Sequence, residues 1–170
     1  MEISQFWQIV TLSDLDLSNS ANEQLKTRLE ALNDSALAEF DALYTKQLRG
    51  LWHWDIWAAA YVLCGCNTEY DFLDFCNWLI SQGETVVALA KSQPDELADY
   101  QAMPIKDGLP YPYCDELDLV AGLLYESRNG DELPYHSVVN FAPQGKKFKD
   151  KPKQLKLDFP KLYAKYWQQH

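Results

Sequence analysis

The sequence predicts an all-α fold: a single-domain helical bundle around one buried central helix, with a long irregular segment before the C-terminal helix. Its 170 residues, 47% of them hydrophobic and 24% charged, are enough to enclose one core. Apolar residues recur at steps of three and four through most of the first 92 residues. The stretch 54–64 is apolar on every side, which is typical of a helix enclosed by others. We therefore expect one domain over residues 1–170.

Short polar residues mark where the N-terminal helices begin. Ser20 and Glu23 have the spacing of a capping box, in which each side chain bonds a backbone amide of the other residue. Asn33 is placed to cap the next helix, and Gly50 is expected to end it. We expect a polar connection over 13–19, between the first helix and this capping box.

The central stretch is followed by further helical segments. Gly65 is expected to end the central helix, and Thr68 to cap the next one. That helix should stop at Gly83, with a shorter helix over 84–91 and a brief helical turn at Pro94. Six side chains of these helices are expected to be largely buried: Trp54, Trp57, Tyr61, Phe72, Phe75 and Leu79.

Two parts of the chain are predicted to be irregular. The first, 101–113, is too rich in proline and glycine for a regular element, and a helix should follow it over 114–130. The second, 131–155, shows no helical period, although 135–141 is compatible with a short strand. A terminal helix is expected over 159–168, with a proline in its first turn.

Charge is divided unevenly along the chain. The net charge is −10 overall, but −16 for residues 1–139 and +6 for 140–170, whose lysines cluster from Lys146 to Lys156. An acidic field disfavours nucleic acids and anionic membranes and favours a basic protein partner. We interpret the lysine run as a solubilising segment laid over the acidic surface. No apolar stretch is long enough to cross a membrane and no signal peptide is recognisable, so the expected location is cytoplasmic.

The cysteines and glycines argue against a bound cofactor. The four cysteines, at 64, 66, 76 and 114, match no usual zinc spacing, so we expect free thiols and no metal. With seven glycines and no glycine-rich turn, the chain offers no phosphate-binding loop. The signatures of serine hydrolases, kinases and nucleotide-binding folds are also missing, which favours a protein that is not an enzyme.

Four stretches carry a family likeness: Phe6-Trp7, Trp54–Tyr61, Phe72–Gly83 and Phe159–Tyr166. Through them the chain resembles the bacterial family known as domain of unknown function 4240, well from 1 to 100 and less evenly beyond. The resemblance implies a helical fold and no assigned activity. The family commonly has arginine at the position of Cys76, and cysteine and glycine at those of Asn67 and Asp71. A charged site built on that arginine would be missing here.

The acidic surface and its aromatic neighbours are the first candidate site. Exposed acids beside tyrosines suit recognition of a basic protein, unless the tyrosines pack back on the helices instead. Six residues are predicted to bind the partner: Asp95, Glu96, Asp99, Tyr111, Tyr113 and Tyr135. The function that this predicts is an acidic protein-binding module, in its most specific form an immunity or antitoxin-type protein that neutralises a basic toxin.

The alternative is an enzyme or small-ligand protein with a pocket beside the Trp54–Tyr61 helix, lined by His53 and Asp55. Residues two apart in a helix do not face each other, so we do not expect His53 and Asp55 to form a direct dyad. We interpret Asp55 as a carboxylate that complements the helix start and accepts a bond from an indole. Five other carboxylates, three of them expected in first turns of helices, show no spacing that brings two of them together: Asp71, Asp74, Asp115, Glu116 and Asp118. An open cleft that reaches Asp55 would favour this alternative.

Overall fold

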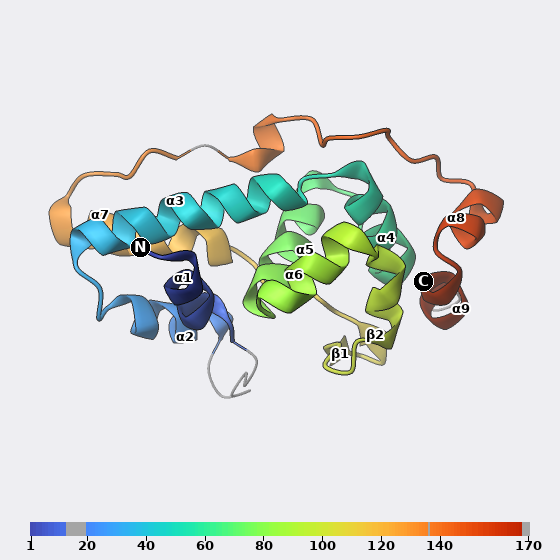
Figure 1. Cartoon of the computed structure of the whole chain (residues 1–170), viewed down its shortest axis with the longest axis horizontal. Helices are drawn as coiled ribbons and strands as arrows, with labels where there is room; N and C mark the ends of the chain where they lie inside the picture. The colour runs from blue at the N-terminus through green and yellow to red at the C-terminus, as the bar shows by residue number, and fades with distance from the viewer. Residues whose placement is uncertain (13–19, 136, 168–170) are drawn as a thin grey trace.

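A computed structural model describes residues 1–12, 20–135 and 137–167 (Figure 1). The chain is mainly helical, as predicted, with only a small two-stranded sheet besides. The predicted connection at 13–19 and the last residue of the predicted terminal helix, Gln168, lie outside the described residues. No helix in the described part is long and apolar enough to span a membrane.

The N-terminal helices begin where their caps predict. The Ser20 hydroxyl accepts a bond from the Glu23 amide at 3.2 Å, and the Glu23 carboxylate accepts one from the Ser20 amide at 3.4 Å. The Asn33 side chain accepts a bond from the amide of Ala36 at 2.9 Å. The predicted capping box and cap are therefore confirmed. The three helices are α1 (Ile3–Val10), α2 (Ala21–Leu29) and α3 (Asp34–Leu51).

The prediction that Gly50 ends the third helix is wrong, because α3 runs through this residue to Leu51. A side chain at position 50 would instead meet Lys91, whose Nζ lies 2.8 Å from where the Cβ atom would stand. The glycine thus makes room for a lysine from a neighbouring helix rather than supplying a turn.

The four elements that follow α3 extend from the middle of the molecule towards its right side (Figure 1). Gly65, in the left-handed region at φ 71°, ends α4, and the Thr68 hydroxyl accepts a bond from Asp71 at the start of α5. Most of α4 is buried, but Trp54 and Tyr61 are only half-buried, contrary to expectation. Their face is covered by single aromatic side chains of the C-terminal segment. The elements are α4 (Trp54–Cys64), α5 (Glu69–Ser81), α6 (Glu84–Ser92) and η1 (Pro94–Asp99).

The segment predicted as irregular at 101–113 contains a short hairpin, β1 (Ile105–Lys106) and β2 (Leu109–Pro110). Its turn is Asp107-Gly108, both at positive φ, which suits a two-residue hairpin loop. The next helix starts later than predicted. Glu116 lies in the left-handed region at φ 56°, so helical structure begins only with η2 (Leu117–Leu119) and α7 (Val120–Asn129).

After α7 the chain crosses the whole length of the molecule to α8 and α9 (Figure 1). The predicted strand at 135–141 is wrong, since η3 (Val138–Asn140) stands there. The predicted irregular segment also ends early, because α8 (Pro152–Asp158) begins before residue 155. This helix buries one side chain, so no helical period shows in the sequence. The terminal helix is α9 (Pro160–Tyr166).

One apolar core runs from Phe6 to Tyr166 and is richest in aromatic rings at the junction of α3, α4 and α5. Trp57 stacks on Trp54 and Phe72, with ring centroids 5.0 and 4.9 Å apart, and Trp52 stacks on Phe72 at 4.7 Å. Stacked rings of this kind hold the start of α4 rigidly in place. That helix start is one wall of a candidate site.

Candidate functional site

A buried network of hydrogen bonds holds the carboxylate of Asp118 in place. Asn77 on α5 is fully buried; it accepts a bond from the Tyr44 hydroxyl on α3 at 2.8 Å. Its amide donates to Asp118 on η2 at 2.9 Å. Within the described residues no buried side-chain nitrogen or oxygen lacks a hydrogen-bond partner, so this network holds the Asp118 carboxylate in one position.

Asp118 forms the floor of a hollow of about 200 Å³ between α3, α7 and the chain that follows α7, here called the acidic pocket. Its lining, within the described residues, holds four carboxylates and no cationic side chain. Leu123 and Tyr135, at the pocket, are 59% and 60% exposed. The lining residues are Asp41, Asp118, Leu119, Gly122, Leu123, Glu126, Glu132, Leu133, Pro134 and Tyr135.

The pKa values of two carboxyl groups in this pocket are raised. Burial, and then the charge of Asp118, raise the pKa of Asp41 to about 6. Burial also raises the pKa of Asp118, although the bond from Asn77 acts in the opposite direction. Two carboxylates that are partly removed from water beside each other favour either a proton or a cation between them.

A further acid, Asp74 on α5, lies close enough to Asp118 to feel its charge. Burial, and then the charges of Asp115 and Asp118, raise the pKa of Asp74 to about 7. The tertiary structure therefore brings together acids that the sequence spacing could not join. Even so, the described residues contain no group of three metal-ligating side chains that could hold an ion.

A larger hollow, about 980 Å³, lies between the start of α4 and the chain from 146 to 159, and is here called the lysine groove. It is an open cleft that reaches His53 and Asp55, as the alternative function requires. Its lining includes five lysines: Lys91, Lys146, Lys147, Lys149 and Lys151. The other lining residues are Gly50, His53, Asp55, Ile56, Ala58, Ser92, Pro94, Phe148, Gln154, Asp158 and Phe159.

His53 and Asp55 do meet, which corrects the sequence-based expectation. His53 is the N-cap of α4 with extended backbone, so helical spacing does not apply to the pair. Its Nδ1 accepts a bond from the Asp55 amide at 3.1 Å and lies 3.8 Å from the Asp55 carboxylate. The indoles of Trp52 and Trp57 donate instead to backbone carbonyls, and the Asp55 side chain is 73% exposed. The predicted indole bond to Asp55 is therefore wrong.

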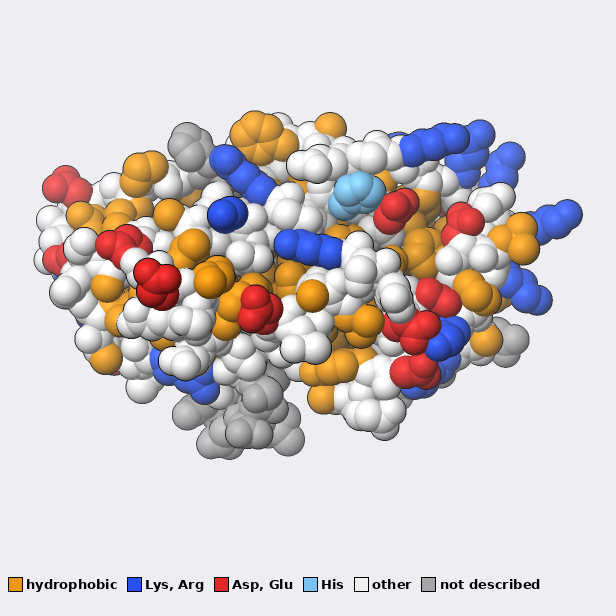
Figure 2. All heavy atoms as spheres, in the orientation of Figure 1, with side chains coloured by type: hydrophobic (Ala, Val, Ile, Leu, Met, Phe, Trp, Pro, Cys, Tyr) orange, Lys and Arg blue, Asp and Glu red, His pale blue; other side chains and the backbone are white. Residues whose placement is uncertain are grey.

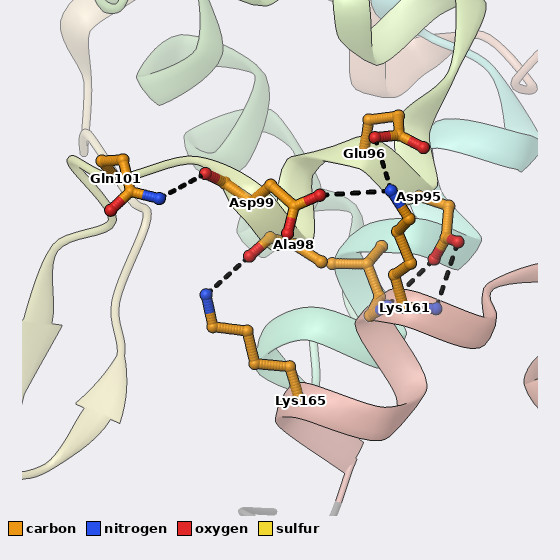
Figure 3. Close-up of polar contacts among 8 residues, drawn as sticks. Asp95, Glu96, Ala98, Asp99, Gln101, Lys161 and Lys165 are labelled. Carbon is orange, nitrogen blue, oxygen red and sulfur yellow. Dashed lines mark hydrogen bonds and ion pairs between the residues drawn. The ribbon is translucent and has the colours of Figure 1, made fainter.

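The three acids predicted to bind a partner lie on η1 and contact the last helix instead (Figure 3). Asp95 accepts bonds from the amides of Lys161 and Leu162 at the start of α9, at 3.1 and 2.9 Å. The Lys161 ammonium donates to Glu96 at 2.8 Å and to Asp99 at 3.2 Å. These carboxylates therefore hold α9 in place, a role that the sequence did not indicate because their partners lie more than 60 residues away.

The three predicted tyrosines do not form one surface with these acids. Tyr111 and Tyr113 pack edge to face beside the hairpin, and the Tyr113 hydroxyl contacts the Cys64 sulfur at 3.2 Å. Tyr135 lies at the acidic pocket, towards the α7 end of the molecule (Figure 1). Only Tyr135 therefore joins a cluster of acids. The pocket acids Asp41 and Glu126 were missed, because nothing in their helices distinguishes them from ordinary solvated positions.

All four cysteines are free, as predicted. Cys66, Cys76 and Cys114 are buried, and Cys64 is half-buried. Burial raises the pKa of Cys64 to about 12 and that of Cys114 to about 11. The thiols of Cys64 and Cys114 are therefore protonated and serve in packing rather than as reactive thiolates.

The fold and the two hollows define a mainly helical protein with separate acidic and basic sites. The chain belongs to the family described as protein of unknown function DUF4240, whose model matches residues 1–127. No curated protein and no solved structure matches it. Because the match ends at 127, each hollow has one wall inside the matched region and one wall outside it.

Proposed function

We propose that the chain is an acidic protein-binding module that captures a lysine or arginine side chain of a basic partner in the acidic pocket. In its specific form it is an immunity or antitoxin-type protein that neutralises a basic toxin in the cytoplasm. The proposal takes the chain as one helical bundle around α4. The observation that carries it is a pocket with four carboxylates, exposed apolar walls and no cation within the described residues.

The pocket suits an amphipathic cation. The aliphatic stem of a lysine or arginine would lie along Leu123 and Tyr135, while its charged head lies between Asp41 and Asp118. A guanidinium would also stack on the exposed tyrosine ring. Binding would convert two carboxylates that repel each other into an ion-paired group.

The charge distribution supports rapid capture. Residues 1–139 carry a net charge of −16, and such a field accelerates encounter with a basic protein. Steering acts over a distance and is screened by salt, whereas the pocket acts only in contact. Association and dissociation rates therefore report on different features of the site.

A matched pair of variants separates long-range steering from contact in the pocket. Glu132→Gln removes a pocket charge, and Asp131→Asn removes the neighbouring exposed charge outside the pocket. Each substitution removes one negative charge, so both should slow association by a similar amount. Only Glu132→Gln should also accelerate dissociation, and the double variant with Tyr135→Ala should dissociate about tenfold faster. The measurement is binding kinetics at low and high salt, with the basic protein that affinity capture recovers from the native host.

Two outcomes would overturn the proposal. Association rates that do not change between low and high salt would exclude electrostatic capture. Dissociation rates that are equal in the Glu132 and Asp131 variants would exclude the pocket as the contact.

A further inference from the structure

We propose that the lysine groove binds a small molecule that carries two or more phosphate groups. The groove is separate from the acidic pocket and independent of the function proposed for it. Its lining combines five lysines with two aspartates in a chain whose net charge is −10. Figure 2 shows lysine and arginine side chains gathered at the end of the molecule that carries α8.

Backbone hydrogen bonds fix the start of the segment that carries four of these lysines. Gln144 accepts a bond from the Trp54 amide and donates one to the Trp52 carbonyl, both at 2.9 Å. Gly145, in the left-handed region at φ 83°, lies against the His53 ring so closely that a Cβ atom there would stand 2.5 Å from it. The lysines that follow therefore leave from a fixed point beside the start of α4.

The same backbone is also held further along. The Phe148 ring packs on Trp54 and Tyr61 of α4, with centroids 6.2 and 5.6 Å apart. Lys151 is the N-cap of α8, and Leu155 of that helix is buried in the core. The lysine run is therefore a held segment, and binding a ligand would cost little ordering of its backbone.

The lysines of the groove are not neutralised by the protein. Within the part of the chain that the structure describes, none of the five lies within 4.0 Å of a carboxylate oxygen, unlike Lys161 on α9. Asp150, inside the run, faces the Tyr61 hydroxyl instead and contributes, after burial, to raising the pKa of that tyrosine. Within the described residues, the structure therefore shows no ion pair that would hold these lysines against the acidic surface.

The lining favours phosphate over other anions. It offers lysines and no arginine, so it supplies several mobile point charges rather than the planar fork that matches a carboxylate. Phe148, Phe159 and Ile56 provide apolar contact for an organic part, and Asp55 and Asp158 can accept bonds from its hydroxyls. The volume of about 980 Å³ is that of a small-molecule site.

Isothermal titration calorimetry with inorganic tripolyphosphate, and with inorganic phosphate for comparison, tests the proposal. Lys147→Gln with Lys149→Gln removes two charges from the groove. Lys153→Gln with Lys156→Gln is the matched control, because both lysines are exposed on the same segment but do not line the groove. We expect tripolyphosphate to bind more tightly than phosphate, the groove variant to lose at least about tenfold in affinity, and the control to lose about twofold or less.

The opposite results would overturn the proposal. Equal losses in both double variants would indicate a diffuse effect of charge rather than a site. Tighter binding of a single-stranded DNA oligonucleotide than of tripolyphosphate would assign the lysines to nucleic acid instead.

A fluorescence titration gives a second readout that does not rely on the lysine variants. The Lys147 ammonium lies over the Trp54 ring at 5.2 Å from its centroid, so a phosphate that draws this lysine away should change the emission. The change should disappear in Trp54→Phe while calorimetric affinity stays within about threefold. An emission change that persists in this variant would show that the ligand binds elsewhere.

Discussion

The acidic pocket is lined in part by α7 and the lysine groove in part by α8, and these two helices lie at opposite ends of the molecule (Figure 1). The two hollows hold their charges in different ways. Asp41 and Asp118 of the pocket stand on α3 and η2, partly out of water, and Asp118 is fixed by a buried amide. The groove lysines stand in water, four of them on a chain segment held by aromatic rings and backbone bonds and Lys91 on α6. A charge removed from water responds to pH, because its protonated form is favoured, whereas a charge left in water responds chiefly to salt.

The contrast extends to how the two sites are built. Three of the four pocket acids lie within residues 1–127, the region that the family model matches, whereas four of the five groove lysines lie beyond it. The acid site depends on the packing of α3, α5 and α7, and the lysine site on one segment that crosses them. Damage to the helical core should therefore affect the acids first.

The largest expected effect is on the buried amide beneath the acidic pocket. Asn77→Ala would remove the side-chain partner of both the Tyr44 hydroxyl and the Asp118 carboxylate, so the free energy of unfolding should fall by about 3 kcal/mol. Urea denaturation measures this change in the free energy of unfolding. Asn22→Ala is the control, since Asn22 also bonds across the chain, to the Asp115 carbonyl, but in water, and should cost about 0.5 kcal/mol. Equal losses would contradict a special role for the buried network.

A smaller effect is expected where the lysine segment is held. Phe148→Ala should cost about 2 kcal/mol, at the low end for a phenylalanine because the ring is half-buried. Hydrogen exchange should accelerate at the amides of Gln144 and Trp54, whose bonds tie the segment to α4. Phe141→Ala, in the same segment but 54% exposed, should leave these amides unchanged. Acceleration in both variants would show that the segment moves as one unit.

The smallest effect sharpens the pH contrast. Because the pKa of Asp41 is raised to about 6, the folded state binds this proton more tightly than the unfolded chain, and ionisation above pH 6 destabilises the fold. Asp41→Asn should therefore stabilise the protein at about pH 8, by about 1 kcal/mol after allowance for solvent screening, and hardly at all at about pH 4. Thermal unfolding at both values measures this. An equal gain at both would contradict the raised pKa.

Local chemistry predicted the starts of α2, α3 and α5. The bonds at Ser20, Asn33 and Thr68 depend on residues three positions away, so a short stretch of sequence is enough to identify them. The hairpin was within reach by the same reasoning, because Asp107-Gly108 is a favoured two-residue turn. The later start of helix at Leu117 was not, since no local rule requires Glu116 to take a left-handed conformation.

The sites were harder to predict because they depend on distant contacts. Asp95 looked like a free surface acid, yet it caps a helix that begins 65 residues later. Asp41 looked like any solvated helix position, yet it faces Asp118 across a pocket. The sequence reveals which side chains are charged but not which charges meet.

By itself, the sequence determined the mainly helical fold, the apolar character of α4, the free thiols and the opposite charges of the two parts of the chain. These depend on composition and on spacings of a few residues, which the chain carries in any conformation. The tertiary structure alone decided that three acids hold α9, that four others form a pocket, and that five lysines line a groove beside His53. Such groupings arise only when packing of the core brings distant segments together, because no local rule specifies a contact across 60 residues.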